Sequence, residues 1–591
     1  MYRYTPILLT IIFFYGCAKI VPPSGGPVDE GPPRVIESEP ANYARNFEGD
    51  EIEIEFDEFI QLQDVNNKLL ISPPMKNQPK IVNKGKEIEL KIIDTLRENT
   101  TYSFNFSDAI VDNNEGNPLE DFEFVFSTGP DIDSLSFEGK VFNAFDNKPV
   151  ENVYAMLYDE LEDSIPYKQV PYYLSRTNDE GHFSINNIRH DTFKVFMLDD
   201  KNRNYMYDMP GERIAFADTL ITFRLDSTIT EDTAGSGPSI KKINMVYKAP
   251  ALDYYLFNED EINQYIKTSD RLERHLLSFA FNEPLVRPLL VEPLRIDHEK
   301  DWAVREVSHR NDSITYWITD STLIKSDTFS LRMEYTYLDK YDSLQTRADT
   351  LMMRSYTVQE DKKGQKEPSL LPVNLRTGSG SFLDLGDSVR IESEHPLGKI
   401  DTTFMRLYEK EDTLFHLVPF GIVNREDQLK RVKVDYEWEP EKTYRLDIFP
   451  NAITDIYGQT TDTLDAQIRV REESFYGNLI LTLESVTGPM VIQLLDNNNS
   501  VKRKHMISSN GEVSFPYLNA ATYRLKAIFD RNGNGKWDTG HYIKGIQPEK
   551  VIFYPQELQI RANWDLEQTW NLASDTTSVS SESPDSLQVP F

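Results

Sequence analysis

Two sequence patterns each occur twice along this chain of 591 residues, and these repeats constrain its fold more than any other feature. In the better aligned pair, Gly181–Ser184 and Gly511–Ser514 open the two copies. An aspartate follows each opening glycine after 19 residues without a gap, at Asp200 and Asp530. A segment that recurs at this scale is one folding unit. The chain is therefore expected to form several similar domains instead of one large core.

The second pattern marks another kind of domain. Each copy begins with Gly-Asp and an alternating run, continues with a strand that opens with Thr-Tyr and reaches an Ala-Ile-x-Asp turn. These segments are Gly49–Ile54, Thr101–Phe104 and Ala109–Asp112 in the first copy, and Gly386–Ile391, Thr443–Leu446 and Ala452–Asp455 in the second. A weaker third copy is indicated where Phe281–Leu285 is similar to Phe56–Ile60.

Apolar and polar residues alternate over short stretches, for example in Ile52–Phe56 and Ile88–Ile92. This alternation places the apolar side chains on one face of a strand. No long stretch has the periodicity of a helix, and the many Phe and Tyr residues, 32 and 30 of them, favour strands. The expected fold class is all-β, with β-sandwich domains in tandem.

The charge balance excludes two classes of partner. The chain has 96 acidic and 63 basic residues, for a formal net charge of -33. Duplex nucleic acid is bound through clustered Lys and Arg that release counterions from the phosphates. An anionic membrane surface attracts basic segments in the same way. We therefore expect no binding to nucleic acid and no attachment to a membrane through surface charge.

The N-terminal segment is typical of a secretion signal. The mostly apolar stretch Ile7–Tyr15 is too short to span a bilayer as a mature helix, and Gly16 and Cys17 follow it. This segment resembles a bacterial lipoprotein signal, which implies a signal peptide over residues 1–16 and a lipid-modified Cys17. Several acyl groups on one terminus give stable anchoring. Because the chain has 1 cysteine, it forms no internal disulfide and no cysteine metal site.

Two further segments differ in composition from the strand-rich middle. Residues 17–34 are rich in Pro and Gly, which predicts a stiff linker after the lipid anchor. Residues 573–591 are rich in Ser, Thr, Asp and Pro, which predicts a disordered tail.

The repeated patterns resemble two sandwich families. The Thr-Tyr and Ala-Ile-x-Asp pattern is similar to the SbsA-type bacterial Ig-like domain, at residues 35–130 and 370–472, with a related β-domain at 250–365. The Gly181 and Gly511 pattern is similar to the transthyretin/carboxypeptidase-regulatory-like sandwich, at residues 135–249 and 475–572. In that family the Gly-x-Phe strand and the Tyr-x-Val/Leu strand pair across the core.

An Asx-rich loop follows the second transthyretin-like pattern and predicts a calcium site. Gly535 stands at loop position 6, where an EF-hand loop turns, and oxygen-bearing side chains stand at positions 1, 3, 5 and 9, namely Asp530, Asn532, Asn534 and Asp538. His541 occupies position 12, where a bidentate acid is expected. Glu549, a carbonyl or water would have to complete the shell of a Ca²⁺ ion.

The first copy has an equivalent loop with a weaker match. Its oxygen-bearing residues are Asp200, Asn202, Asn204 and Asp208, and Asp199 and Glu212 add oxygens nearby. Tyr205 occupies the position of the turn glycine. For both loops the alternative interpretation is an Asx hairpin held by its own side-chain-to-backbone hydrogen bonds. A bound Ca²⁺ ion would be structural in either loop.

No catalytic pattern stands out in the sequence. The 9 histidines are scattered, and no His-Glu-x-x-His, Gly-x-Ser-x-Gly or phosphate-binding Gly-Lys-Ser/Thr pattern occurs. Acid pairs such as Asp57 and Glu58 could serve a glycosidase, but among 96 acids such pairs arise by chance. The chain is therefore not expected to be an enzyme.

Taken together, the lipoprotein signal, the linker and the two kinds of sandwich resemble a family of Bacteroidota outer-membrane lipoproteins. The resemblance implies a non-enzymatic protein that is lipid-anchored in the outer membrane and exposed on the extracellular face. The leading hypothesis is a scaffold or accessory subunit of an integral outer-membrane β-barrel protein or complex, such as a protein assembly or export machine. The alternative is a glycan-binding surface lipoprotein for nutrient capture.

Overall fold

The computed structural model describes residues 30–573 apart from 210, 233–239, 249–250, 261–263, 339–342, 356–369, 380–381 and 426. The predicted signal peptide, Cys17, most of the linker and the predicted tail from residue 574 lie outside the described residues. The internal contacts divide the chain into two compact units. The first holds the chain up to Phe142 together with Lys148–Leu256, and the second holds Asn143–Asn147 together with the chain from Phe257 onward.

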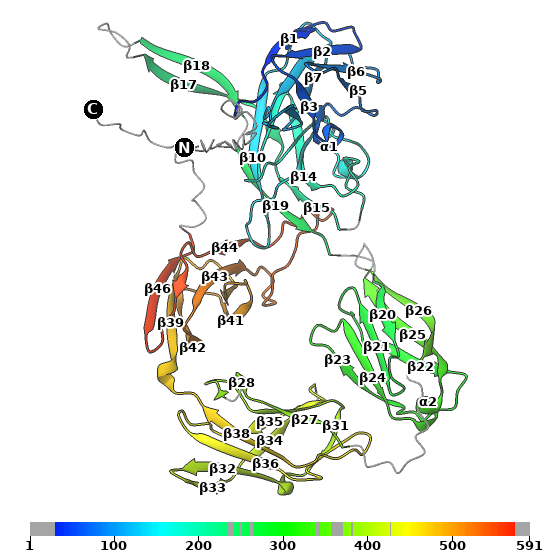
Figure 1. Ribbon diagram of the computed structural model, residues 1–591, viewed down its shortest axis with the longest axis vertical. Coiled ribbons are helices and arrows are strands. Elements are labelled where there is room, and N and C mark those ends of the chain that lie inside the picture. Colours follow the sequence, from blue (N-terminus) through cyan, green and yellow to red (C-terminus); the bar gives the residue numbers. More distant parts are fainter. Residues whose placement is uncertain are drawn as a thin grey trace, which may run out of the picture. The chain divides into compact units, whose positions relative to one another are not determined.

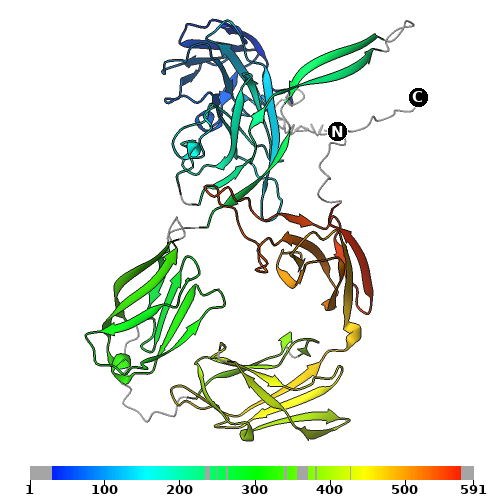
Figure 2. The ribbon, with the colours of Figure 1, turned by 180° about the vertical axis from the view of Figure 1, so that it is seen from behind.

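Strands form nearly all of the regular structure, as Figures 1 and 2 show from opposite sides. This confirms the predicted all-β class. Helices in the described part of the chain are limited to α1 (Val65–Lys68), α2 (Ser321–Lys325) and the 3-10 turns η1 (Ile165–Tyr167), η2 (Thr402–Phe404) and η3 (Glu473–Phe475). None of the described helices has the length and apolar character needed to cross a bilayer.

Module 1 contains β1–β9, drawn in blue in Figure 1, and its sheets have the orders β1-β2-β6-β5, β4-β7-β9 and β3-β8. The alternation in β2 buries Ile52, Ile54 and Phe56 completely and leaves the glutamates between them exposed. These side chains form one core with Phe104 and Phe126 of the facing sheet. The strands are β1 (Val35–Glu39), β2 (Glu51–Phe56), β3 (Ile60–Leu62), β4 (Leu70–Ser72), β5 (Lys80–Asn83), β6 (Glu87–Lys91), β7 (Thr101–Asn105), β8 (Ile110–Asp112) and β9 (Glu123–Ser127).

Module 2 contains β10–β19, and its main sheet has the order β12-β11-β14-β15-β19-β10-β13. Its core gathers side chains from both ends of this sheet, including Phe137, Phe183 and Val195. The strands are β10 (Leu135–Asn143), β11 (Tyr154–Tyr158), β12 (Tyr173–Arg176), β13 (His182–Ile188), β14 (Thr192–Asp199), β15 (Arg213–Phe216), β16 (Ile221–Thr222), β17 (Arg224–Asp232), β18 (Ile240–Lys248) and β19 (Leu252–Asn258).

Module 5 contains β39–β46 and repeats the strand pairing of module 2. Its sheets have the orders β42-β39-β46 and β41-β40-β43-β44, which match β13-β10-β19 and β12-β11-β14-β15 of module 2 strand for strand. The core includes Leu481, Phe515 and Trp570. The strands are β39 (Tyr476–Glu484), β40 (Met490–Leu495), β41 (Val501–Ile507), β42 (Gly511–Asn519), β43 (Thr522–Phe529), β44 (Val551–Phe553), β45 (Leu558–Gln559) and β46 (Asp565–Asn571).

Module 3 contains β20–β26 in two sheets, β20-β21-β24-β23 and β22-β25-β26. Phe279 and Phe281 of β21 are buried against Met333 and Tyr335 of β25 within one core. The strands are β20 (Ile266–Asp270), β21 (Leu276–Phe281), β22 (Leu290–Leu294), β23 (Ala303–Val307), β24 (Ser313–Ile318), β25 (Thr328–Leu338) and β26 (Leu344–Arg354).

Module 4 contains β27–β38, with a four-stranded sheet β27-β30-β35-β34 and a six-stranded sheet β28-β29-β38-β36-β32-β33. Ile391 and Val432 of the first sheet pack with Tyr444 and Ile468 of the second. The strands are β27 (Val373–Arg376), β28 (Gly378–Ser379), β29 (Phe382–Leu383), β30 (Arg390–Ser393), β31 (Leu397–Ile400), β32 (Met405–Glu411), β33 (Leu414–Val418), β34 (Gly421–Asn424), β35 (Arg431–Asp435), β36 (Thr443–Ile448), β37 (Ile453–Asp455) and β38 (Leu464–Val470).

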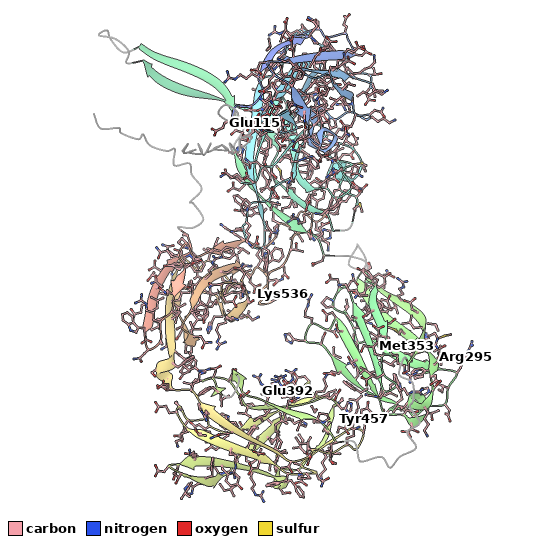
Figure 3. All side chains as sticks on the ribbon, in the orientation of Figure 1. Glu115, Arg295, Met353, Glu392, Tyr457 and Lys536 are labelled. Carbon is pink, nitrogen blue, oxygen red and sulfur yellow. The ribbon has the colours of Figure 1, made fainter. Side chains whose placement is uncertain are left out.

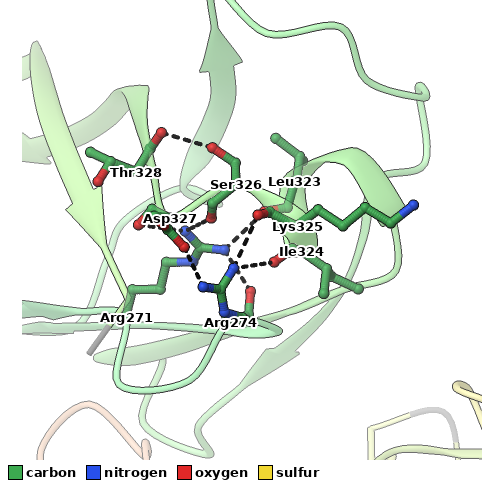
Figure 4. A network of polar contacts seen from close by, with 8 residues as sticks. All are labelled: Arg271, Arg274, Leu323, Ile324, Lys325, Ser326, Asp327 and Thr328. Atoms are coloured by element: carbon green, nitrogen blue, oxygen red, sulfur yellow. Dashed lines mark hydrogen bonds and ion pairs between the residues drawn. The ribbon is translucent and has the colours of Figure 1, made fainter. Parts of the chain in front are cut away.

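A buried arginine closes the C-terminal end of α2 in module 3 (Figure 4). Arg271 is 1% exposed, and its guanidinium donates to the carbonyl oxygens of Leu323 at 2.9 Å and Ser326 at 2.8 Å. It also donates to the carbonyl oxygen of Arg274 at 2.8 Å and lies over the Phe329 ring. The last carbonyls of a helix have no partner inside the helix, and a cation there interacts favourably with them. Burial lowers the pKa of Arg271 to about 10.

Candidate metal loops and their contacts

The second Asx loop lies between β43 and β44 of module 5. Asp530 is fully buried and accepts hydrogen bonds from the backbone N–H groups of Asn534 at 3.1 Å and Gly535 at 2.7 Å. The side-chain oxygen of Asn532 accepts a further bond from the Asn534 N–H at 3.0 Å. Because the carboxylate of Asp530 satisfies two N–H groups that a tight turn leaves unpaired, it fixes the shape of the loop.

The structure brings all four predicted ligand residues of this loop together. The side-chain amides of Asn532 and Asn534 both donate to the same oxygen, Oδ2 of Asp538, at 2.5 and 2.6 Å. Two amides therefore converge on one carboxylate, with Asp530 at the base of the same loop.

Glu549, which lies two residues before β44, closes the loop from its other end. Its two carboxylate oxygens accept the backbone N–H groups of Arg531 at 2.8 Å and Asp538 at 3.0 Å. Glu549 is 2% exposed. Burial raises its pKa above the usual value, although the two N–H groups act in the opposite direction.

The first Asx loop, between β14 and β15 of module 2, has the same construction. Asp200 accepts N–H groups from Arg203 at 2.6 Å and Tyr205 at 2.8 Å. The amides of Asn202 and Asn204 donate to the two oxygens of Asp208, at 3.0 and 2.8 Å. The weaker sequence match therefore folds into an equivalent cluster.

Glu212 has the role in the first loop that Glu549 has in the second. Its oxygens accept the N–H groups of Lys201 at 3.2 Å and Asp208 at 3.1 Å, which are the second and ninth residues of the loop. From the sequence, Glu212 and Glu549 are recognisable only as oxygen-bearing residues near the two loops. Their equivalence is hidden because Glu212 follows Asp200 by 12 residues whereas Glu549 follows Asp530 by 19.

Tyr205 adopts the backbone conformation that the turn glycine of the other loop adopts. Its φ is 60°, and that of Gly535 is 76°. A side chain in the left-handed region is strained. The ring of Tyr205 packs edge-on against Tyr154 with the centroids 5.1 Å apart, and this contact offsets the strain.

The donor set of both loops is compatible with Ca²⁺. The amide oxygens of Asn532 and Asn534 accept the backbone N–H groups of Asn534 and Lys536 at 3.0 Å each. To direct these oxygens toward the point where the two amides meet, both amides would have to turn over and give up these bonds. Carboxylate and amide oxygens are the ligands that Ca²⁺ takes. Within the described residues, no group of three or more His, Cys, Asp or Glu is arranged to hold a metal ion. A site here would therefore depend on the asparagine amides.

Each loop also contacts a segment outside its own sandwich. In the first loop, Arg203 donates to the side chain of Asn67 in module 1, and Arg176 donates to the Asn67 carbonyl oxygen at 3.1 Å. Lys536 marks the second loop in Figure 3. In the second unit, Thr539 beyond this loop donates to the carbonyl oxygen of Asn258 at 2.5 Å.

A close approach reinforces the contact at the second loop. A Cβ atom on Gly540 would lie 2.6 Å from the Phe257 ring, so only glycine permits the observed packing. The N–H of Tyr542 donates to the carboxylate of Glu259 at 2.5 Å. The rings of Trp537 and Phe145 meet edge-on with the centroids 5.2 Å apart. The second loop and the residues after it therefore pack against Phe145 and against the segment 257–259 of the second unit.

A cluster of rings joins modules 3 and 4, and Figure 3 labels Tyr457 within it. The Tyr457 ring lies 5.2 Å from the rings of His275 and His395, measured between centroids. Nδ1 of His395 is 2.8 Å from Oδ2 of Asp455, which is the buried aspartate of the Ala-Ile-x-Asp turn. Burial lowers the pKa of His275, which favours the neutral ring in this contact.

Comparisons with known proteins find similarity to one domain family and to several solved structures. No curated protein sequence matches the chain. Among solved structures, the major pilin subunit BcpA of Bacillus cereus shares 9% identity, with 74% of this chain and 99% of that chain covered and a TM-score of 0.13. The surface layer protein SbsC, domains 1–6, shares 10% identity, with 89% and 67% covered and a TM-score of 0.13.

A third structure is the SGBP-B protein of a mixed-linkage glucan utilization locus of Bacteroides ovatus, in complex with a heptasaccharide. It shares 8% identity, with 70% of this chain and 89% of that chain covered and a TM-score of 0.17. Likenesses this weak carry no argument about function. Residues 29–128 match the family model described as a bacterial Ig-like domain, so the first module is similar to that family, as the Thr-Tyr and Ala-Ile-x-Asp pattern predicts.

Proposed function

We propose that this chain is a non-enzymatic, lipid-anchored surface scaffold of the outer membrane. In this proposal its β-sandwich modules bind an integral outer-membrane protein or complex, such as a protein assembly or export machine, and act as its accessory subunit. The observation that carries the proposal is that polar and aromatic side chains at the module boundaries bond to neighbouring modules. Arg203 with Asn67 and His275 with Tyr457 are two such contacts.

The buried acid of the first Ala-Ile-x-Asp turn, Asp112, has structural hydrogen-bond partners. Asp112 accepts the N–H groups of Asn114, Glu115, Gly116 and Asn117. Burial acts to raise the pKa of Asp112, but these four bonds outweigh it and lower the pKa to about 2. A carboxylate held ionised in this way is a poor general acid or base near neutral pH. This supports a binding role.

The lipid anchor is the first part of the proposal to test. Cys17→Ser removes the thiol that would be acylated, so the variant is expected to stay unprocessed or become soluble. The measurement is fractionation of membranes after a high-salt wash, followed by immunodetection. A Cys17→Ser variant that stays with the outer membrane would show that lipidation does not hold the protein there.

Calcium binding is the second part of the proposal. We propose that the Asx loops bind structural Ca²⁺ through Asp530, Asn532, Asn534 and Asp538, and more weakly through Asp200, Asn202, Asn204 and Asp208. The ion would hold the amides and carboxylates in one arrangement and so stiffen the loops that contact neighbouring segments. No other cofactor is required by this proposal.

The partner is best identified by affinity purification of the tagged protein from its native membranes in a mild detergent. We expect an integral outer-membrane β-barrel protein to copurify at a constant ratio. Interfaces of this kind bury about 800 Å² per partner and depend on a few anchor residues. Purification of the intact protein with no membrane protein at a comparable level would contradict the scaffold proposal.

A glycan-binding surface lipoprotein for nutrient capture is the second candidate function. One observation favours it: a cleft in the first unit, between modules 1 and 2, has the size of a ligand site. The residues that line this cleft restrict which ligands it could take.

A further inference from the structure

The cleft lies between two loops of module 1 and the tip of the first Asx loop. It encloses about 750 Å³. Module 1 contributes Pro74, Met75, Lys76, Gln78, Asp94–Arg97 and Tyr102, and module 2 contributes Val170 and Arg203–Tyr205. Ligand sites for small molecules usually have volumes of about 300–1,000 Å³. The cleft is therefore large enough for a short oligomer of two or three sugar units.

Hydrogen bonds between the two modules fix the walls of the cleft. The N–H of Leu174 in β12 donates to the Ser72 hydroxyl in β4 at 3.3 Å. Arg176 of β12 donates to the carbonyl oxygen of Asn67 at 3.1 Å. Because both modules belong to one compact unit, the cleft is preformed and its ligand would not have to order the walls.

Three cations line the cleft, in a chain whose net charge is -33. They are Lys76, Arg97 and Arg203, and none of them forms an ion pair with a carboxylate among the described residues. The one acid in the lining is Asp94, whose two oxygens accept bonds from the backbone and side chain of Asn77 at 2.8 and 2.6 Å. These bonds lower the pKa of Asp94. The cleft therefore carries an excess of positive charge.

Neighbouring groups hold the two guanidinium groups in place. Arg97 lies over the Tyr172 ring at 4.9 Å from its centroid. Arg189 lies over the same ring at 4.4 Å, but it is paired with Asp159 at 2.9 Å. Arg203 is held by the side chain of Asn67. Fixed guanidinium groups can bind a carboxylate through two parallel hydrogen bonds at a small entropic cost.

The remaining lining has an apolar or aromatic part and a polar part. The first consists of Pro74, Met75, Leu96, Tyr102, Val170 and Tyr205, and the second of Gln78, Thr95 and Asn204. Tyr205 is partly exposed and Val170 is 40% exposed, so both offer surface to a ligand. A ligand that fits this lining has an apolar face and negative charges along its edge.

We propose that this cleft binds an acidic oligosaccharide, one that carries uronic acid carboxylates. A sugar ring offers an apolar face to Tyr205 and Val170, and the carboxylates would bond to Arg97, Arg203 and Lys76. A peptide that binds by adding a strand to a sheet edge fits less well, because that mode needs an open edge. The lining residues lie in loops, except for Tyr102 in the central strand of the sheet β4-β7-β9.

This inference goes beyond the scaffold proposal and does not depend on it, because partner copurification and saccharide binding are separate measurements. The test is calorimetric titration of the full-length protein in detergent with galacturonate oligomers. We expect binding that weakens about 10-fold or more when NaCl rises from about 50 to about 300 mM. Cello-oligosaccharides of the same length should bind at least about 10-fold more weakly, since they lack carboxylates.

Charge-reversal variants assign the binding to the cleft. Arg97→Glu and Lys76→Glu should each weaken galacturonate binding by about 10-fold or more. Arg45→Glu is the matched control, because Arg45 is an exposed arginine of the same module, does not line the cleft and forms no ion pair among the described residues. It should leave binding unchanged. Thermal unfolding of each variant checks that module 1 is intact.

Three results would overturn the inference. The first is no galacturonate binding at millimolar concentration. The second is equal weakening by Arg45→Glu and Arg97→Glu, which would mean that net charge and not the cleft is responsible. The third is a poly-glutamate peptide that binds as tightly as the oligosaccharide and loses affinity with the same variants, which would assign the cleft to acidic peptides.

Discussion

Lys526 in β43 is a residue whose environment opposes its charge. It is 2% exposed, and its ammonium group lies 3.2 Å from the centroid of the Phe145 ring and 5.8 Å from that of Phe553. Burial lowers its pKa to about 8 from 10.5, although Asp146 acts in the opposite direction. The unfolded chain therefore takes up the proton first as the pH falls. Lys526 destabilises the folded form fully below about pH 8, and this effect disappears as the pH rises toward 10.5.

We predict that Lys526→Met raises the free energy of unfolding of module 5 by about 1–3 kcal/mol at pH 7, because an apolar side chain of similar length needs no hydration. The advantage over the wild type should shrink as the pH is raised from 8 toward 10.5. Urea unfolding at several pH values measures both effects. Lys433→Met, at an exposed strand position, is the control and should change little. An advantage that does not vary with pH would contradict the assigned pKa.

The sequence could not have predicted this burial. Along β43, Tyr523 and Leu525 point into the sandwich core, so the alternation places Lys526 on the outer face, where a lysine is normally solvated. Phe145, which is far away in the sequence, covers that face. By contrast, the buried positions of β2 follow directly from its alternation, because Ile52, Ile54 and Phe56 need only one neighbouring sheet to be covered.

At the scale of single elements, α2 depends on Arg271. We predict that Arg271→Leu lowers the free energy of unfolding of module 3 by about 3 kcal/mol or more, because it leaves the carbonyls of Leu323, Arg274 and Ser326 without their donor. Arg271→Lys should recover part of the loss, since it restores the charge but not the planar fork.

The control for α2 is Arg310→Leu, which removes an arginine whose side chain is 72% exposed. Its effect should stay within about 0.5 kcal/mol. Chemical denaturation followed by tryptophan fluorescence is suitable, because Trp302 and Trp317 lie in module 3. If Arg271→Leu were as stable as Arg310→Leu, the bonds to the end of α2 would not stabilise the module.

The Asx loops give the second prediction at this scale. Adding Ca²⁺ to chelator-treated protein should raise the Tm of module 5, because an ion that binds only the folded form stabilises it by mass action, by about 2.7 kcal/mol at 100 times its Kd. Asp530→Ala with Asp538→Ala should remove most of this shift.

Asp496→Ala is the matched control for the loop. Asp496 also accepts backbone N–H groups in a turn of module 5, from Asn498 and Ser500, but it belongs to the hairpin between β40 and β41. This variant should keep the Ca²⁺ shift even if its Tm is lower. A wild-type Tm that does not change with Ca²⁺ would leave the loops as hydrogen-bonded Asx hairpins.

The two loops also show how far the repeats could be predicted. The aspartates and asparagines align without a gap, so their common fold follows from the sequence. The shared role of Glu212 and Glu549 does not, because the return segments to β15 and β44 differ in length. The left-handed backbone conformation of Tyr205 could not be predicted either, because a tyrosine rarely adopts it. The contact with Tyr154, which the sequence does not reveal, compensates for this preference.

At the scale of the whole molecule, the contacts between modules could not be read from the sequence. Each joins residues that belong to different repeats, such as Arg203 with Asn67 and Tyr457 with His275. Such pairs have no periodicity and no fixed spacing. The lining of the cleft between modules 1 and 2 was hidden for the same reason, because its cations are spread over more than 120 residues of sequence, from Lys76 to Arg203.

A scaffold acts by occupying surface, so the proposed function predicts a response to mutation that differs from that of an enzyme. If the proposal holds, individual alanines at Asp57, Glu58, Asp112 or Asp455 should leave function in cells near normal, because a scaffold needs no single acid for a reaction. In an enzyme, truncating one catalytic acid costs orders of magnitude in rate.

The most direct test of the scaffold account is the amount of integral outer-membrane protein that copurifies with this chain before and after removal of residues 475–572. We predict that the deletion releases the membrane partner while the remaining modules stay folded and lipidated, and that the four single alanine variants retain the partner at the wild-type ratio. The account is contradicted if one acid-to-amide substitution abolishes function in cells while folding and partner binding remain intact.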